Sequence, residues 1–377
     1  MMNRYLLTPG PVPIPPEIAL KEALPIFHHR TDEFAAVYKN IAEGLKYIFQ
    51  TENEVYVLAA SGTGAMEMAV ANLLSPGDKI IVASCGDFGD RWAEIAQGYG
   101  IRVIAASVRW GKTVKPAEIE RVLKENSDAK AVYTTFTETS TGVANDIKSV
   151  GGIVSKTDAV LVVDAISGLA GQEFRTDEWK VDVAISASQK GFMLAPGLAF
   201  ITLSGKAWKL VETSKIPKFY FDIKKYKKFY SAGETPFTPP LTLIAALQES
   251  VRLIKERGLE NIWNDCKLLA RAARAAMKAL GLELFGEVPC EIVTSASVPV
   301  DIGIKIVKTL REKYGVSIAS GQGDLKGRII RFAHLGCIGK ADLLAGFTCL
   351  EMVLIELGVK IEKGKAAAAV EEILLKT

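Results

Sequence analysis

The sequence predicts an α/β protein with a second, smaller α+β domain. Between residues 55 and 203, short runs rich in Val and Ile alternate with stretches whose apolar residues recur at helical spacing. Such alternation is typical of a mostly parallel sheet covered by helices on both faces. After Gly281 the pattern changes to α+β, and 377 residues exceed what one small core needs. We therefore expect an extended arm at 1–16, a large domain at 17–250 and a small C-terminal domain at 251–377.

Composition narrows the class of protein. The 49% hydrophobic and 24% charged residues are ordinary for a soluble globular chain. The net charge of +3 is too small to indicate binding to nucleic acid or to a membrane surface. No signal peptide begins the chain. The three histidines lack ligand-like spacing, so we expect no metal site. Five scattered cysteines without a CxxC motif indicate reduced thiols and a cytoplasmic protein.

The elements of the large domain follow in order. Five prolines between residues 9 and 16 predict the extended arm, which could cross an active site or be a disordered tail. Apolar spacing then predicts a helix at 32–49. The strands that we expect next are 55–58, 79–82, 101–105, 131–135, 161–163, 181–186 and 198–203, and the helices between them are 65–74, 87–99, 116–125 and 147–155.

The basic and aromatic run at 215–230 interrupts this order. It could bind nucleic acid, but we favour an irregular segment with solvated lysines and packed rings. Helices are expected at 238–257 and 259–280. Beyond Gly281 we expect strands near 282–285, 291–298, 316–319 and 328–333, with helices near 301–314 and 340–357.

One lysine has an unusual setting. Lys190 follows the apolar run 181–185, and Asp164 closes another apolar run 26 residues earlier. A lysine at the end of a buried strand is costly unless it is neutralised or bonded. Imine formation with an aldehyde cofactor uses such a lysine, and pyridoxal phosphate (PLP) also needs an acid at its pyridinium nitrogen. The alternative is a surface lysine in a strand-to-loop turn.

Three further motifs fall at strand ends. The turn Ser61–Gly64 joins a strand to a helix, where backbone N–H groups and glycines suit a phosphate, although a plain turn is the alternative. Phe88 could stack on a planar cofactor or simply pack at a helix start. The hydroxyls at 139–141 could bond a cofactor or cap a helix. Open α/β sheets bind ligands at the carboxyl ends of their strands, so these motifs together predict one site.

With these residues in view, the chain resembles the class V aminotransferase family of fold-type I PLP enzymes, in the branch of alanine–glyoxylate and serine–pyruvate aminotransferases. The resemblance runs nearly the full length. The stretches that carry it are 8–11, 61–67, 74–78, 138–143, 163–165, Gly171, 189–190, 235–239, 258–260 and 331–336.

The resemblance implies roles for individual residues. Lys190 would hold PLP, Asp164 would pair with its ring nitrogen, and Arg331 would grip the substrate α-carboxylate. A segment of the neighbouring subunit would reach the phosphate, which implies a homodimer. Ala65 departs from members that carry histidine there. The other cofactor-binding residues implied are Thr63, Gly64, Phe88, Thr139, Gln189, Thr235 and Thr238.

The implied activity is amino transfer from alanine or serine to glyoxylate or pyruvate by a ping-pong mechanism. No second arginine is placed by motif for a dicarboxylate, which favours a small donor. Three alternatives stay open. They are an aminotransferase with another donor (aspartate, phosphonate or ureido type), a cysteine desulfurase, for which Cys337 looks more like a packing residue, and a non-catalytic accessory subunit.

Overall fold

The computed structural model describes residues 5–376. A seven-stranded sheet lies at its centre, in the order β2-β10-β9-β8-β5-β3-β4. Only β10 is antiparallel to its neighbours, and the other pairs are parallel. The strands are β2 (Val55–Ala59), β3 (Lys79–Ala83), β4 (Arg102–Ala105), β5 (Ala131–Thr135), β8 (Val160–Asp164), β9 (Val183–Ala187) and β10 (Leu198–Leu203).

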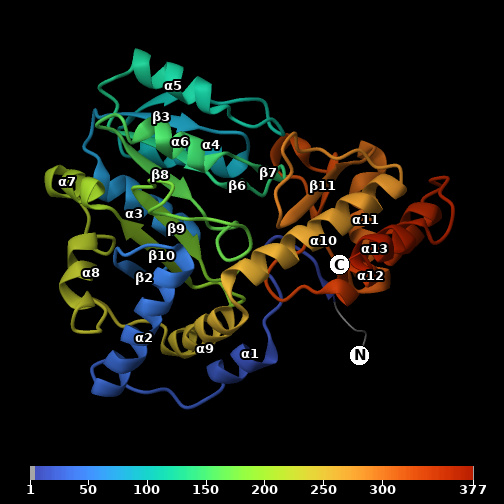
Figure 1. Cartoon of the computed structure of the whole chain (residues 1–377), viewed down its shortest axis with the longest axis horizontal. Helices are drawn as coiled ribbons and strands as arrows, with labels where there is room; N and C mark the ends of the chain where they lie inside the picture. The colour runs from blue at the N-terminus through green and yellow to red at the C-terminus, as the bar shows by residue number, and fades with distance from the viewer. Residues whose placement is uncertain (1–4, 377) are drawn as a thin grey trace.

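Helices cover both faces of this sheet (Figure 1). Successive strand residues alternate between two apolar clusters, as a pleated strand requires. In β2, Val55 and Val57 pack with α2, α5, α6 and α9, whereas Tyr56 and Leu58 pack with α3, α4, α7 and α8. These helices are α2 (Asp32–Phe49), α3 (Gly62–Leu73), α4 (Asp87–Gly98), α5 (Pro116–Glu125), α6 (Ile147–Val154), α7 (Gly205–Thr213), α8 (Ile223–Tyr230) and α9 (Leu241–Arg257).

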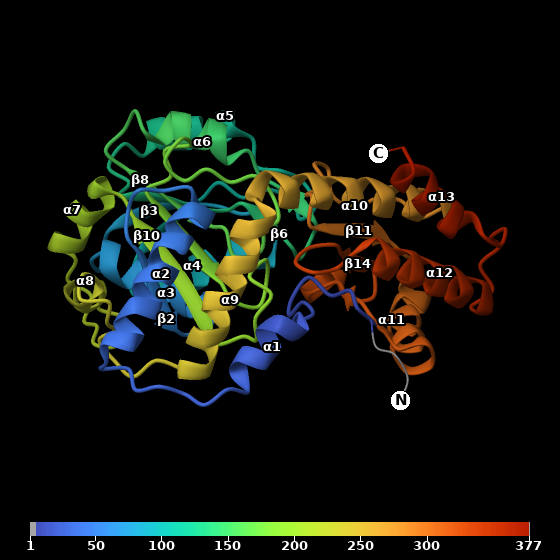
Figure 2. The same cartoon turned by 60° about the horizontal axis from the view of Figure 1, so that its bottom comes forward.

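A second group of elements lies beside the sheet, coloured orange to red in Figures 1 and 2. It contains the antiparallel sheet β11-β14-β13. Its elements are α10 (Leu259–Ala279), β11 (Val293–Ser297), α11 (Val300–Tyr314), β12 (Val316–Ser317), β13 (Ala319–Ser320), a 3₁₀ turn (Gly323–Leu325), β14 (Ile329–Ala333), α12 (Lys340–Glu356) and α13 (Lys365–Leu374). The division near residue 250 stays a prediction, and α9 runs through that position.

The start of the described chain joins both groups. Strand β1 (Tyr5–Leu6) pairs in parallel with β12, and Leu7 is fully buried. The arm then reaches the loop after β9, where the Val12 N–H donates to the Gln189 carbonyl at 3.2 Å. Helix α1 (Pro16–Glu22) follows and packs on α9. Residues 1–4 of the predicted arm lie outside the described residues.

The predicted fold class is confirmed, with three local corrections. Helix α3 begins at Gly62, so the glycine-rich turn is the first turn of the helix rather than a loop before it. The segment 223–230 is the helix α8, in which buried Ile223 and Tyr226 lie three residues apart on one face. The strand expected near 282–285 is only an isolated bridge between Leu284 and Ala296.

Candidate active site

A cavity of about 180 Å³ opens at the carboxyl ends of the central strands. Strands β8 and β9 are parallel neighbours, so Asp164 and the loop after Ala187 emerge at the same edge of the sheet. Lys190, Gln189 and Asp164 all line this cavity. The remaining lining residues are Ser61, Gly62, Thr63, Met66, Phe88, Arg91, Thr137, Ile166 and Ser167.

Lys190 is 9% exposed and its amine is held by the N-terminal arm. Its Nζ donates to the Pro9 carbonyl at 2.6 Å, and a Cβ on Gly10 would lie 2.4 Å from that nitrogen. Gly10 also has a φ of +148°, which residues with a side chain rarely adopt, so glycine is favoured where the arm passes the lysine. Burial lowers the pKa of Lys190 to about 8, and the Asp164 carboxylate partly opposes this shift. The neutral form of the amine is thus far more populated near physiological pH than in an ordinary lysine, although the charged form still predominates.

Asp164 is 3% exposed at the last position of β8. Its Oδ1 accepts from the Ile166 N–H at 2.8 Å, which fixes the carboxyl group. Burial, with a smaller contribution from the Glu138 carboxylate, raises the pKa of Asp164 to about 7, although the Ile166 N–H and the charges of Lys190 and Arg91 oppose the shift. The site therefore holds an acid that is poised to share a proton with a cationic partner.

The first turn of α3 forms another wall. Ser61 occupies the N-cap position without a capping hydrogen bond from its side chain, so the N-terminal N–H groups of the helix keep capacity for an anion. Gln189 Oε1 and Thr137 Oγ1 are buried atoms without a hydrogen-bond partner among the described residues. Buried polar atoms normally find partners. Their position here indicates a site built for a polar ligand.

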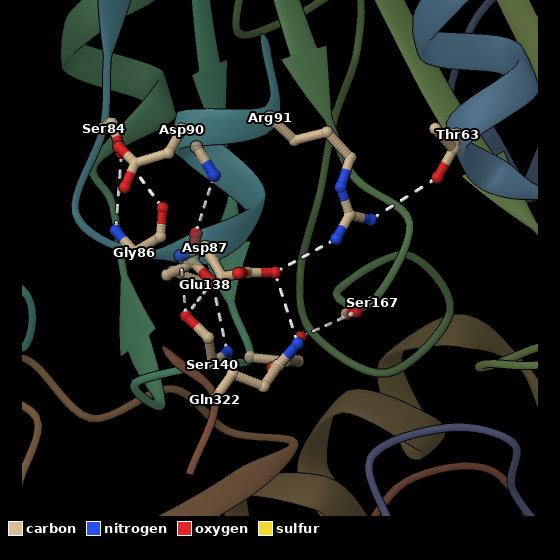
Figure 3. Close-up of polar contacts among 12 residues, drawn as sticks. Thr63, Ser84, Gly86, Asp87, Asp90, Arg91, Glu138, Ser140, Ser167 and Gln322 are labelled. Atoms are coloured by element: carbon tan, nitrogen blue, oxygen red, sulfur yellow. Dashed lines mark hydrogen bonds and ion pairs between the residues drawn. The ribbon is translucent and has the colours of Figure 1, made fainter. Parts of the chain in front are cut away.

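A buried carboxylate, Glu138, anchors the backbone next to Phe88. Glu138 accepts from the Gly89 N–H at 2.9 Å and from the Ser140 N–H at 3.1 Å, and it anchors the start of α4 (Figure 3). The guanidinium of Arg91 lies 4.8 Å from the centroid of the Phe88 ring. Arg91 also donates to Asp87 at 3.0 Å and more weakly to Thr63 at 3.4 Å. The ring is therefore held in place on one side by a cation.

Arg331 reaches toward the same region from β14. It is 6% exposed, and its Nη1 donates to the Thr139 carbonyl at 2.7 Å. Burial lowers its pKa to about 10, while Glu138 and Asp87 raise it again. Thr139 connects Arg331 to the cavity, because the Thr139 hydroxyl lies 3.5 Å from that of the lining residue Ser167. Arg331 does not itself line the 180 Å³ cavity.

Not every predicted site residue lines the cavity. The Thr139 hydroxyl lies 3.5 Å from that of Ser167, which does line it. Gly64 does not line the cavity either. It follows the lining residue Thr63 in the chain and lies against Ala60 and Phe221. Thr235 donates to the Phe237 carbonyl at 2.8 Å, and Thr238 lies 3.4 Å from His29 Nε2. The last two lie outside the cavity wall in a single chain, so their predicted role depends on a second subunit.

The model of the class-V aminotransferase family matches residues 22–325. The chain belongs to this family. It is a PLP-dependent aminotransferase, and the expected family, fold and enzyme class are confirmed.

Relatives match over nearly the whole chain. A "Soluble hydrogenase, small subunit" from Synechococcus sp. is 40% identical over 98% of each chain. An L-aspartate–glyoxylate aminotransferase from Paracoccus denitrificans is 36% identical, covering 97% and 95% of the two chains. A serine–glyoxylate aminotransferase from Methylorubrum extorquens is 35% identical, covering 99% and 96%. The crystal structure of ureidoglycine–glyoxylate aminotransferase from Bacillus subtilis covers 100% and 99%, with a TM-score of 0.95 at 31% identity.

The residues present fit the cofactor of this aminotransferase family. A helix N-terminus with uncapped N–H groups suits a phosphate, a lysine with a depressed pKa suits an aldehyde, and a buried acid suits a ring nitrogen. The unpartnered Gln189 Oε1 and Thr137 Oγ1 are further polar atoms that a bound group could satisfy.

Sequence reasoning gave no role to several residues around the cavity of this aminotransferase. Arg91 follows Phe88 by three positions on α4, a spacing that places both on one helix face. Glu138 is the first residue of the 138–142 motif. An acid next to hydroxyl residues and a glycine is a sequence signal that could have identified it. Gln322 had none, because its contacts with Asp87 and Arg331 depend on tertiary packing.

Cys337 fits packing rather than catalysis. Its Sγ lies 3.2 Å from the Pro13 carbonyl, and it borders a different cavity from Lys190. Burial raises the pKa of the Cys337 thiol, whereas a nucleophilic thiol needs a lowered pKa. Among the described residues no group of three or more His, Cys, Asp or Glu could hold a metal ion, and no helix is long and apolar enough to cross a membrane.

Proposed function

We propose that this aminotransferase moves an amino group from alanine or serine to glyoxylate or pyruvate by a ping-pong mechanism. The observation that carries the proposal is the pairing of Lys190 and Asp164 in one buried cavity. Burial pulls their two pKa values toward each other, to about 8 and about 7. A neutral amine and a protonatable acid in one site are what amino transfer needs near neutral pH.

Lys190 and Asp164 are assigned the catalytic roles. When bound, PLP supplies an aldehyde for the lysine and a ring that accepts electrons. The Lys190 amine would take the proton from Cα of the donor, a role for which a lysine with a pKa near 8 is suited. Asp164 would pair with the ring nitrogen of the cofactor and keep it protonated. Glu138 accepts from the Gly89 N–H and so holds the start of α4, which carries the cavity-lining Phe88 and Arg91.

The remaining contacts to the cofactor are assigned to residues in and around the cavity wall and to a second subunit. The α3 N-terminus with Thr63 and Gly64 would hold the phosphate, together with Gln189. Phe88 would stack on the ring, and Thr139 would lie near the ring hydroxyl. Thr235 and Thr238 would reach the phosphate of the partner subunit.

Arg331 is assigned to the substrate α-carboxylate. A guanidinium offers parallel N–H groups that match a carboxylate, and burial strengthens such a pair. Arg331 adjoins the cavity that holds the Lys190 amine, because it donates to Thr139, whose hydroxyl lies 3.5 Å from the lining residue Ser167. This arrangement orients the donor with its Cα toward the lysine.

The choice of donor is the least constrained part of the proposal. The relatives include both a serine and an aspartate enzyme with glyoxylate as acceptor. Arg91 is the arginine in the cavity wall, and its charge is already paired with Asp87 at 3.0 Å. We therefore favour small donors over dicarboxylates.

One experiment tests the proposal directly. The purified protein should be yellow, and Lys190→Ala should lose that absorbance. Alanine, serine and aspartate are then assayed against glyoxylate, pyruvate and 2-oxoglutarate, with Arg331→Ala raising KM for the donor by about 100-fold. A protein that stays colourless with added PLP, or an Arg331→Ala variant with an unchanged KM, would contradict it.

We also propose a cytoplasmic homodimer. The free cysteines among the described residues support the compartment. The position of Thr235 and Thr238 outside the cavity of their own chain supports the dimer. A sedimentation experiment on the holoenzyme measures the assembly state.

A non-catalytic accessory subunit is the second candidate, because one relative is described as a hydrogenase subunit. A scaffold without catalysis has no use for the Lys190–Asp164 pair, whose burial is costly. The absorbance and donor assays above separate the two candidates.

A further inference from the structure

Gln322 links the two halves of the candidate site. It lies just after β13, and its side chain is half-buried. Its Nε2 donates to Asp87 Oδ2 at 3.2 Å, and its Oε1 accepts from Arg331 Nη1 at 3.1 Å. Figure 3 shows Gln322 beside Asp87 below the start of α4. One amide therefore touches both the helix that carries Phe88 and the arginine on β14.

The donors of Arg331 are almost fully used. A guanidinium has five N–H groups. Nε and Nη2 both donate to the Ser320 carbonyl, at 2.9 and 2.6 Å. Nη1 donates to the Thr139 carbonyl at 2.7 Å and to Gln322 at 3.1 Å. Four of the five N–H groups thus have protein acceptors among the described residues.

A carboxylate that binds arginine in bidentate geometry needs two N–H groups. With one N–H left, such a ligand must displace an existing acceptor. Ser320 and Thr139 offer backbone carbonyls, and these are fixed because Ser320 is paired with β14 and Thr139 is buried. Gln322 offers a side-chain oxygen. It is therefore the acceptor that can leave.

We propose that the Gln322 amide oxygen stands in for the substrate carboxylate on Arg331 and that an incoming carboxylate displaces it. This inference rests on the proposed role of Arg331. Gln322 keeps the guanidinium hydrogen-bonded before substrate arrives, so the buried N–H is not left unsatisfied. It also sets the affinity for the donor, because every carboxylate competes with it.

The surroundings favour such an exchange. Asp87 accepts from Nε2 and thereby turns Oε1 toward Arg331. Gly321 and Gly323 flank Gln322, and Gly323 has a φ of +48°. A neutral amide binds a guanidinium less strongly than a carboxylate does. The substrate carboxylate is thus expected to displace the Gln322 amide from Arg331. The displacement should make substrate binding measurably weaker than it would be without Gln322.

Two variants with opposite expected effects test the idea. The probe is propionate, a carboxylate without an amino group, titrated calorimetrically into the PLP-loaded enzyme. Gln322→Leu removes the competing oxygen and should tighten propionate binding by about fivefold. Gln322→Glu places a permanent carboxylate beside Arg331 and should weaken binding at least tenfold. Cofactor absorbance should stay unchanged in both.

The outcomes separate the two proposals. If Arg331→Ala leaves propionate binding intact, Arg331 does not read the carboxylate and the assignment under the proposed function is wrong. If Arg331→Ala abolishes binding but Gln322→Leu leaves it unchanged or weakens it, the displacement idea alone is refuted. Gln97→Leu, at an exposed position of α4, is the matched control and should bind as the parent protein does.

Discussion

Lys190 is a buried amine whose charged form the surrounding protein disfavours. Its nearest acceptor is a neutral carbonyl of the arm, at 2.6 Å, rather than a carboxylate. Asp164 is likewise a buried acid whose charged form burial disfavours. Each group opposes the pKa shift of the other, so changing one should move the titration of its neighbour.

Chemical modification of the cofactor-free protein measures this coupling. Only the neutral amine reacts with formaldehyde and cyanoborohydride, so methylation of Lys190 should rise with pH to a midpoint near 8. The Asp164 carboxylate raises the Lys190 pKa, so Asp164→Asn should move the midpoint down by about one pH unit. Peptide mass spectrometry across the pH range gives both curves. A midpoint near the ordinary lysine value of 10.5, or an upward move in the variant, would contradict the assignment.

At the scale of elements, close contact between backbone segments decides how helix α6 packs in the large group of elements. Helix α6 lies against the segment before β9, and a Cβ on Gly151 would stand 1.8 Å from the Trp179 carbonyl oxygen. The next residue, Gly152, has nothing within 4 Å of its imaginary Cβ. One helix thus contains a required glycine and a replaceable one side by side.

Alanine at each of these two positions should have opposite effects. Gly152→Ala should stabilise the protein by up to about 1 kcal/mol, because alanine lowers the entropy cost of the helix. Gly151→Ala should destabilise it by about 3 kcal/mol, because backbone must shift to make room. Urea unfolding of the two variants gives the comparison. Equal effects would show that α6 does not depend on this contact.

At the scale of the whole molecule, the arm and the second group of elements close the site. Leu7 packs into the small elements, where a Cβ on Gly346 of α12 would lie 2.3 Å from its side chain. Two residues later, the Pro9 carbonyl accepts a hydrogen bond from Lys190 Nζ at 2.6 Å. The N-terminal segment therefore ties the small elements to the lysine.

Mixed dimers test the proposed sharing of sites between subunits. Lys190→Ala alone and Thr235→Ala/Thr238→Ala together should each reduce activity strongly, the second by about 100-fold through loss of phosphate contacts. When the two proteins are mixed and allowed to exchange subunits, one site per hybrid regains an intact lysine and intact threonines. Activity should then recover toward a quarter of the parent value. No recovery in confirmed hybrids would refute a shared site.

Local patterns in the sequence were sufficient for much of this protein. Alternating Val and Ile runs predicted the central strands, because a strand buried on both faces must be apolar at successive positions. The same patterns placed Asp164, Lys190 and Thr63 at strand ends, where parallel strands bring them to one edge. The run at 215–230 was misjudged in part, since its lysines obscured the apolar face of α8.

Tertiary structure decided the contacts between residues far apart in the chain. Arg331 bonds Thr139 across 192 positions, and Lys190 bonds Pro9 across 181. No local propensity encodes such pairs, because they arise when the arm and the small elements pack against the sheet. The sequence by itself determined the order of strands and helices in the large domain and which polar residues stand at the strand ends. Packing alone decided that the side-chain amide of Gln322 is hydrogen-bonded to Arg331, the residue that the family resemblance assigns to the substrate carboxylate.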